Sequence, residues 1–302
     1  MNNQNKVWTG IGLAVLAALI WSGNFIIARG EATKIPPISL AFYRWFTASI
    51  IIAPIAFQKF KSEITVVKKS LHHLFWTALF GVTLFNTFVY IAGHYSPAIN
   101  LALIGTTSSP VMSIILARIF LKEHITPLRI TGLVLCIIGI LLLLSKGSWE
   151  TLQHFRFTPG DWWILAAALA FAIYNIFVRT KSAGISAVNF SFVTFILGTL
   201  IIFPFYIWEL TTSAFVQWDL NLVLSILYLA IGASVISFLC WNAAIARLGA
   251  GRASLFGNLI PIFSTIEAVL ILNEKISSIQ IISGFLVIGG LVLANLVLSK
   301  KS

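Results

Sequence analysis

The chain has few charged residues and, above all, few acidic ones. Asp, Glu, Lys and Arg make up 10% of the 302 residues, and 9 acidic residues stand against 20 basic ones. Soluble domains carry about 25% charged residues, so a water-soluble fold of this length is excluded. The only cysteines, Cys136 and Cys240, both lie in apolar runs and provide neither a disulfide framework nor metal-ligand spacing.

Motifs of catalysis are also lacking. The sequence contains no G-x-S-x-G, no H-E-x-x-H and no glycine loop of the kind that cradles phosphate. The five histidines fall in or beside expected loops and form no ligand pair at helical spacing: His72, His73, His94, His124 and His154. The sequence therefore predicts no enzyme, no cofactor and no metal site.

Long apolar runs dominate what is present, since 59% of the residues are hydrophobic. A membrane-spanning helix needs about 20 apolar residues. Such runs lie at 8–28, 39–57, 74–93, 97–121, 127–145, 162–180, 187–208, 220–245, 251–272 and 277–298. The pattern predicts an all-α integral membrane protein with ten transmembrane helices, five in each half.

The second half of the chain repeats the first at an offset of 151 residues. Polar and aromatic residues recur at this offset in the pairs Asn24/Asn175, Tyr90/Trp241, Pro110/Pro261, Ser113/Ser264 and Glu123/Glu274. An odd number of spans in each half inserts the second copy upside down. We therefore expect two inverted five-helix repeats, residues 1–148 and 149–302, which is the architecture of secondary transporters.

Basic residues orient the bundle. With the N-terminus inside, most of them fall on the cytoplasmic side: Lys6, Lys59, Lys61, Lys68, Lys69, Arg118, Lys122, Arg129, Arg179, Lys181, Arg247, Arg252, Lys300 and Lys301. The positive-inside rule then predicts that both termini are cytoplasmic. Because these residues are dispersed among loops, the net charge of +11 does not indicate nucleic-acid binding.

Polar side chains inside the expected spans are the candidates for substrate binding, because an unsatisfied polar group in hydrocarbon is costly. The candidates are Trp21, Asn24, Asn86, Tyr90, Tyr174, Asn175, Ser237, Trp241, Asn242 and Asn258. They come from corresponding helices of the two halves, which indicates one shared cavity. Pro110 and Pro261 are the candidate kinks for gating. The alternative is that these polar residues join helices and that the prolines only bend them.

Two ionisable residues lie well inside expected spans, Arg44 and Glu267. Both are about five residues from the outer end of a helix, so at about 1.5 Å per residue they share a depth of about 7–8 Å. We expect them to form an ion pair, directly or through water, because an isolated charge there is costly. The alternative role for Glu267 is proton acceptor in coupled transport.

Several of these features together resemble the EamA-type members of the drug/metabolite transporter superfamily. They are the ten spans in two inverted repeats, the segment Trp21-Ser22-Gly23-Asn24, Arg44 in the second span, and the pairs Pro110/Glu123 and Pro261/Glu274. The resemblance covers the whole chain. Lys122-Glu123 and Asn273-Glu274 stand where the family usually has Gly-Glu, and Glu267 stands where a small or apolar residue is usual.

The resemblance implies a carrier in the bacterial inner membrane that moves small metabolites, often amino acids and often outward, by alternating access to a central cavity. Amino acids, aromatic ones included, are the expected substrates, and nucleobases or nucleosides are the alternative. A membrane scaffold or a membrane enzyme is the alternative from a different class. The expected partners are the lipid bilayer, a small-molecule substrate and protons as a candidate coupling ion, for a monomer or a homodimer.

Overall fold

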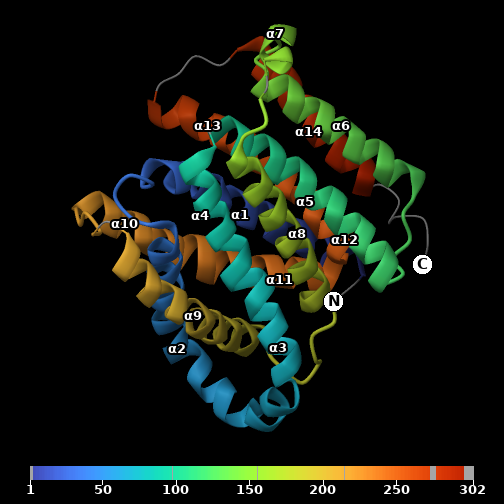
Figure 1. Ribbon diagram of the computed structural model, residues 1–302. Helices are drawn as coiled ribbons and strands as arrows, with labels where there is room; N and C mark the ends of the chain where they lie inside the picture. The colour runs from blue at the N-terminus through green and yellow to red at the C-terminus, as the bar shows by residue number, and fades with distance from the viewer. Residues whose placement is uncertain (1–2, 97, 155, 214, 273–276, 296–302) are drawn as a thin grey trace.

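The computed structural model describes residues 3–96, 98–154, 156–213, 215–272 and 277–295, and this part of the chain folds into helices and loops without strands (Figure 1). The helices of the first half are α1 (Asn3–Gly30), α2 (Pro37–Lys69), α3 (Leu71–Ala78), the π-helical segment η1 (Leu79–Leu84), α4 (Phe85–Tyr95), α5 (Ala98–Phe120) and α6 (Pro127–Leu144). Those of the second half are α7 (Trp149–Gln153), α8 (Pro159–Arg179), α9 (Ala187–Thr212), α10 (Leu220–Tyr228), the π-helical segment η2 (Leu229–Ile236), α11 (Ser237–Leu248), α12 (Ala250–Ala253), the 3-10 segment η3 (Ser254–Leu259), α13 (Ile260–Leu272) and α14 (Ser278–Asn295).

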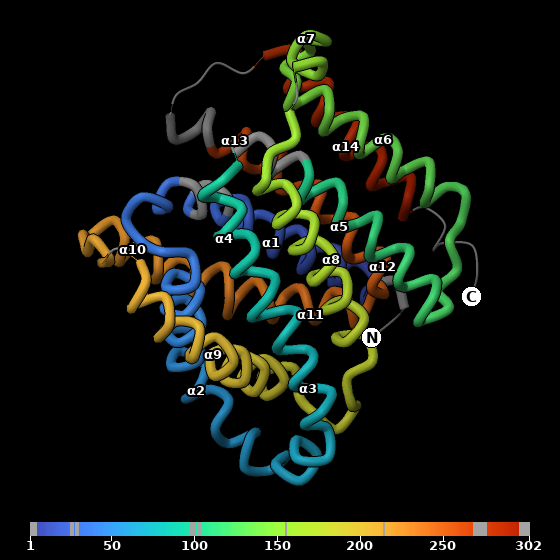
Figure 2. Tube along the Cα trace, viewed as in Figure 1, coloured from blue at the N-terminus to red at the C-terminus, as the bar shows by residue number. Residues whose placement is uncertain are grey.

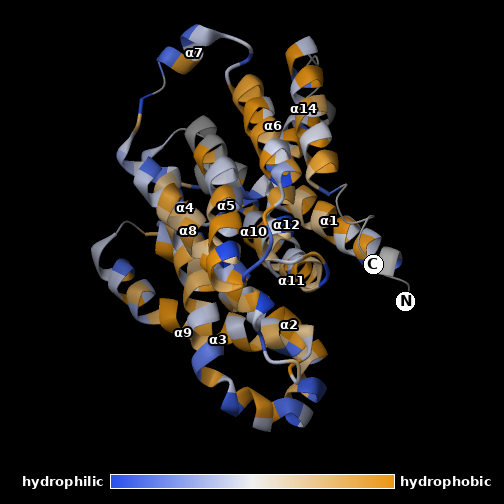
Figure 3. Cartoon of the chain, turned by 90° about the vertical axis from the view of Figure 1, so that its right-hand side faces the viewer, coloured by the Kyte–Doolittle hydropathy of each residue, from blue (hydrophilic) through white to orange (hydrophobic). Residues whose placement is uncertain are grey.

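The prediction of an all-α membrane fold is confirmed. Eight helical stretches among the described residues are long and apolar enough to cross a bilayer, and Ile104–Phe120 forms a shorter apolar helix. The ninth expected span, 251–272, is divided among α12, η3 and α13. Figure 3 shows hydrophobic residues along the length of the bundle helices, with hydrophilic residues concentrated at helix ends and loops.

Two connections differ from the sequence expectation. The segment 58–73 is not a loop, because α2 continues to Lys69 and α3 begins at Leu71. No Pro or Gly interrupts residues 55–69, and Val67 remains buried, so the helix extends past the apolar run that marked its span. The expected loop 146–161 contains the short helix α7.

The two repeats interlock through equivalent contacts. Helix α1 packs against α11, and α8, which corresponds to α1, packs against α4, which corresponds to α11. Figure 2 shows this arrangement at the centre of the molecule, with α1 beside α11 and α8 beside α4. The central core is therefore shared between the two repeats.

The helices α6 and α14 cross at a point where their backbones touch (Figure 1). A Cβ on Gly132 would lie 2.4 Å from the carbonyl oxygen of Gly290, and one on Gly290 would lie 2.5 Å from that of Gly132. Next to this crossing, the Cys136 thiol donates to the carbonyl of Val287 over 3.4 Å. Cys136 and Val287 are 151 residues apart, so the pseudo-twofold axis passes between these helices.

Both repeats contain a π-helical segment at the same place. In η1 and just beyond it, the Asn86 amide donates to the Gly81 carbonyl over 3.4 Å, and in the second repeat the Ser237 hydroxyl donates to the Gly232 carbonyl over 2.9 Å. Both pairs occur at the repeat offset. A π-helical turn removes normal i→i+4 bonds and leaves carbonyls available for other donors, and the side chain five residues on takes one of them here.

In the pair formed by α2 and α9, a carboxylate near the end of each helix caps the start of the other helix. Glu209, near the end of α9, accepts from the backbone nitrogens of Ile38 and Ser39 at the start of α2, over 3.0 and 2.6 Å. Glu63, near the end of α2, accepts from the backbone nitrogen of Ser186 and the Asn189 amide at the start of α9, over 2.9 and 2.8 Å. A carboxylate at a helix N-terminus satisfies free N–H groups and complements the helix dipole.

The loop between α1 and α2 is tied to the start of α10. The Lys34 ammonium lies 2.8 Å from Asp219 and 3.4 Å from Glu31, and the backbone nitrogen of Gln217 donates to the Lys34 carbonyl. The hydrogen bond between Lys34 and Asp219 raises the pKa of Lys34 and lowers that of Asp219. This contact again joins one repeat to the other.

Replacing Glu209→Gln should destabilise the protein. Glu209 is only 4% exposed, and the amide side chain retains one acceptor where the carboxylate has two. Hydrogen bonds to charged groups contribute about 1.5–3 kcal/mol each, so we expect a lower melting temperature in detergent. Glu150→Gln, at an exposed position of α7, is the matched control. Equal melting temperatures for the two variants would contradict the assigned cap.

Candidate functional site

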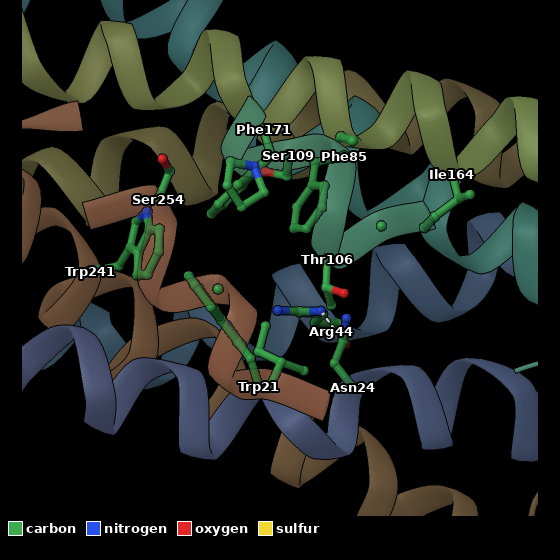
Figure 4. A pocket seen from close by; sticks show the side chains of 15 residues that line it. Trp21, Asn24, Arg44, Phe85, Thr106, Ser109, Ile164, Phe171, Trp241 and Ser254 are labelled. Atoms are coloured by element: carbon green, nitrogen blue, oxygen red, sulfur yellow. Dashed lines mark hydrogen bonds between the residues drawn. The ribbon is translucent and has the colours of Figure 1, made fainter. Parts of the chain in front are cut away.

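A small cavity lies where the two repeats meet (Figure 4). Its walls come from α1, α2, α4, α5, α8, α11, η3 and α13. The lining residues are Trp21, Asn24, Arg44, Phe85, Gly105, Thr106, Ser109, Pro110, Ile164, Ala168, Phe171, Trp241, Ser254, Gly257 and Ile260. Polar groups are few and aromatic rings many, as in pockets that orient an organic solute.

Arg44 is the polar centre of the cavity, and it is held by neutral groups from both repeats. Its Nε donates to the Ser234 hydroxyl over 2.7 Å, and its Nη2 donates to the Ala233 carbonyl over 3.0 Å. The Nη1 atom lies 2.7–2.9 Å from three acceptors in the first repeat, which are the side-chain oxygens of Asn24, Asn86 and Tyr90. The guanidinium therefore has a fixed position.

The charge of Arg44 has no carboxylate partner. Arg44 is 1% exposed, and none of the ion pairs among the described residues includes it. It is also the one charged residue in the described lining of the cavity. An uncompensated buried charge costs several kcal/mol unless hydrogen bonds solvate it, and the neutral acceptors around the guanidinium provide that solvation. The cavity consequently retains a net positive charge.

The segment η2 supplies the carbonyl that links this charge to the aromatic wall. The Ala233 carbonyl accepts from Arg44 Nη2 and also from the indole nitrogen of Trp21, over 2.8 Å. One carbonyl accepting two side-chain donors is possible because the π-helical segment leaves it outside the regular helix ladder. The position of Trp21 is thereby fixed relative to that of Arg44.

Four aromatic rings line the cavity around Arg44 and Asn24. The ring centroids of Trp21 and Trp241 are 5.0 Å apart, and Phe171 lies 5.6 Å from Trp21 and 5.7 Å from Trp241. Phe85 extends the wall, with its centroid 4.6 Å from that of Phe171. These distances are those of attractive aromatic pairs. In Figure 4 these rings lie around the space that also receives Arg44 and Asn24.

The asparagines repeated in the two halves make equivalent contacts with different surroundings. The Tyr90 hydroxyl lies 3.5 Å from the Asn24 amide oxygen, and at the repeat offset the Trp241 indole nitrogen donates to the Asn175 amide oxygen over 2.9 Å. Asn24 also accepts from Arg44 and faces the cavity. Asn175 instead donates to the Ser113 hydroxyl and is fully buried between helices.

The structure divides the ten predicted substrate-binding residues into two groups. Trp21, Asn24 and Trp241 line the cavity, together with the predicted kink Pro110. The others lie behind this layer: Asn86 and Tyr90 hold Arg44, Asn175 holds Trp241, Tyr174 donates to Asn242 over 2.6 Å, and Ser237 bonds to Gly232. Asn258 is fully buried beside Cys136 with neither amide atom hydrogen-bonded, and Pro261 is also outside the described lining. Glu274, the repeat partner of Glu123, lies outside the described residues.

The predicted direct ion pair between Arg44 and Glu267 is not formed. Glu267 accepts from the Ser22 hydroxyl over 2.5 Å instead. Ser22 and Asn24 are two residues apart on α1, which is about 200° around the helix axis. Ser22 therefore faces α13 while Asn24 faces Arg44, and α1 stands between the two charges. The expected equal depth in the membrane does not fix the angle around the helix axis, and this angle decides which side chains meet.

Sequence reasoning did not select Phe85, Phe171 and Ser254 as site residues. Phenylalanine is abundant in the chain, and one on the cavity wall has the same local pattern as one facing lipid. For Phe171 a signal existed, since it precedes Tyr174 by three residues and lies on the same helix face. Ser254 sits in the 3-10 segment η3, which the expected span 251–272 did not foresee.

Comparison with known proteins assigns the chain to a family. The profile of the EamA-like transporter family matches it twice, at residues 8–145 and 158–296. The chain belongs to the EamA-like transporter family. It is thus a transporter of the drug/metabolite kind, built from two repeats, as the resemblance in the sequence implied.

Relatives of this family member are similar along almost their whole length. An uncharacterized transporter of Archaeoglobus fulgidus is 28% identical over 94% of this chain and 96% of its own. A probable amino-acid metabolite efflux pump of Escherichia coli is 24% identical over 92% of each chain, and a probable terminal-alkyne amino-acid exporter of Streptantibioticus cattleyicolor is 24% identical over 98% of this chain and 95% of its own. A solved crystal structure has the same fold, with a TM-score of 0.77 at 19% identity and 98% coverage of both chains.

We expect Asn175→Leu to lower the melting temperature in detergent. The change leaves the Trp241 indole N–H without its acceptor in a fully buried position, which costs about 1–3 kcal/mol. Asn221→Leu, at an exposed position of α10, is the control for loss of an amide. A melting temperature of Asn175→Leu equal to that of the control would show that the Asn175–Trp241 contact does not hold the core.

Proposed function

We propose that this transporter carries small solutes with a carboxylate group, amino acids first among them, through the cavity at the repeat interface. The uncompensated guanidinium of Arg44 is the observation that carries the proposal. A buried cation that only neutral groups solvate attracts an anionic group, and a carboxylate matches the geometry of a guanidinium. The aromatic wall suits an apolar or aromatic side chain of the same solute.

Two donors at the cavity wall remain for the solute carboxylate. A guanidinium has five N–H groups, and the Nη2 atom of Arg44 donates to one protein acceptor, Ala233, so its second N–H is left. The Asn24 amide accepts through its oxygen, and its nitrogen makes no hydrogen bond among the described residues. Arg44 Nη1 donates to the Asn24 amide oxygen over 2.9 Å, so the two side chains that carry these donors lie next to each other.

The proposal also includes the direction of transport, the coupling ion and the location of the protein in the cell. Relatives named as an amino-acid metabolite efflux pump and an amino-acid exporter support outward transport. Interlocked inverted repeats favour alternating access by rocking of one repeat against the other. The family and its bacterial relatives support the bacterial inner membrane as the location, and the distribution of basic residues favours both termini in the cytoplasm. Glu267, hydrogen-bonded to Ser22 beside Trp21, is the candidate for proton coupling.

Flux measurements in proteoliposomes test the substrate class. We expect saturable counterflow of radiolabelled amino acids, strongest for those with apolar or aromatic side chains, and competition by other carboxylates. The amide derivatives of the same amino acids should not compete, because they lack the group that Arg44 attracts. Preference for nucleobases or nucleosides over amino acids would contradict the proposal.

Asn24→Ala should raise the KM for the transported amino acid about ten-fold, because a hydrogen bond to a charged group contributes about 1.5–3 kcal/mol. Ser237→Ala is the control, since Ser237 is a polar residue of the same bundle that bonds to Gly232 and does not line the cavity. We expect its KM within about two-fold of the wild-type value. Equal effects of the two variants would remove Asn24 from the binding site.

A further inference from the structure

Glu123, in the turn between α5 and α6 of the first repeat, contacts the start of α12 in the second repeat, next to the cavity. Lys122, just beyond α5, has a φ of 54°, and this left-handed turn directs Glu123 back toward the second repeat. The two carboxylate oxygens of Glu123 accept from the backbone nitrogens of Ala250 and Gly251, over 3.0 and 3.3 Å. These nitrogens are the first of α12, so the carboxylate caps a helix of the other repeat.

The chain around this contact fits the carboxylate closely. Gly249 has a φ of 90°, which side-chain-bearing residues rarely adopt, and a Cβ there would lie 2.7 Å from a Glu123 oxygen. A Cβ on Gly251 would lie 3.2 Å from the other oxygen. Glycine is thus needed at position 249, and Gly251 lies in close contact with the same carboxylate. The segment Gly249-Ala250-Gly251 therefore fits the position of the Glu123 carboxylate.

The capped backbone leads directly into the cavity wall. The Gly251 nitrogen donates to Glu123, and the Gly251 carbonyl accepts from the Ser254 hydroxyl over 3.1 Å. Ser254 lines the cavity, as do Gly257 and Ile260 further along the same segment. One helical turn therefore separates the Glu123 carboxylate from a group that faces the solute. A displacement of α12 at Glu123 must move Ser254.

Two arginines supply the opposite charge at this contact. Arg129 approaches a Glu123 oxygen to 3.9 Å, and Arg252 lies close enough to both residues for their charges to interact. Both arginines are more than nine-tenths buried, at 9% and 7% exposure. The carboxylate therefore holds α12 through charge-assisted hydrogen bonds and also balances buried positive charge, and its neutralisation disturbs both at once.

From this geometry we propose that Glu123 is a positioning residue for transport, which keeps the cavity closed at the α12 end and sets the place of Ser254 in its wall. Opening this end requires α12 to leave the carboxylate, so the two backbone hydrogen bonds set the balance between the closed and the open arrangement. The inference rests on the proposed function in that the cavity is the path of the solute. It adds a residue outside the cavity that governs access to it.

Thiol accessibility at position 254 tests the role of Glu123 without a known substrate. Ser254→Cys is introduced into a background with Cys136→Ala and Cys240→Ala, and the rate of alkylation by a small water-soluble maleimide is measured in detergent and from each side of proteoliposomes. We expect Glu123→Gln to raise this rate about ten-fold or more, because it exchanges charge-assisted for weaker hydrogen bonds. Glu150→Gln, an exposed carboxylate on α7, should leave the rate unchanged.

Gly249→Ala provides a second variant that leaves the carboxylate intact. Its Cβ is incompatible with the φ of 90° and with the Glu123 oxygen, so it should raise the alkylation rate in the same way. Both variants should retain a cooperative melting transition, and in flux assays both should change the maximal rate more than the KM. Unchanged alkylation in both folded variants would overturn the proposal. Alkylation that rises while no amino acid is transported would support the role of Glu123 and refute the proposed substrate class instead.

Discussion

The solvation of one buried guanidinium is the constraint on which the centre of this molecule depends. Arg44 belongs to the first repeat, yet Ala233 and Ser234 of the second repeat hold it as firmly as Asn24, Asn86 and Tyr90 of the first. Because a charge in the membrane interior requires these partners, the placement of α1, α2, α4 and η2 is coupled through a single side chain. The π-helical turn in η2 is part of the same solution, since it makes the Ala233 carbonyl available to Arg44 and to Trp21. Asn24, which lines the cavity, therefore lies next to Asn86 and Tyr90, which hold Arg44 from behind the cavity wall.

Several of the few acidic residues cap helices of the opposite repeat. Three of the nine, Glu63, Glu123 and Glu209, accept from backbone nitrogens at the start of a helix in the other repeat. The first N–H groups of a helix have no partner within the helix, and a charged carboxylate is a stronger acceptor for them than a neutral group. These caps join the two halves at their helix starts, in addition to the polar contacts that Arg44, Ser22 and Lys34 make across the same boundary.

The fold was predictable from the sequence because its signals are long and redundant. The apolar runs predicted the membrane spans. The offset of 151 residues predicted which helices are equivalent in the two repeats, α1 with α8 and α4 with α11. The site was predictable only in part, because a helical pattern locates polar residues without telling which neighbours they meet. Asn24 and Asn175 are identical in type and in repeat position, yet one faces the cavity and the other lies between helices. Arg44 and Glu267 share a depth but lie on opposite sides of α1, and this depends on the angle around a helix rather than on position along it.

The chemical difference between the two repeats makes the cavity asymmetric. The backbone features recur at the offset, including the π-helical segments, the asparagines and the crossing of α6 with α14. The chemistry does not recur, since the position equivalent to Arg44 is Phe195, which is fully buried with its ring centroid 4.8 Å from that of Trp45. Tyr90 and Trp241 differ in the same sense, a hydroxyl near the guanidinium in one repeat and an indole in the aromatic wall of the other. Two guanidiniums related by the pseudo-twofold axis would repel each other across a narrow space. With a phenylalanine at the equivalent position, the cavity has one guanidinium, contributed by the first repeat, among rings from both repeats.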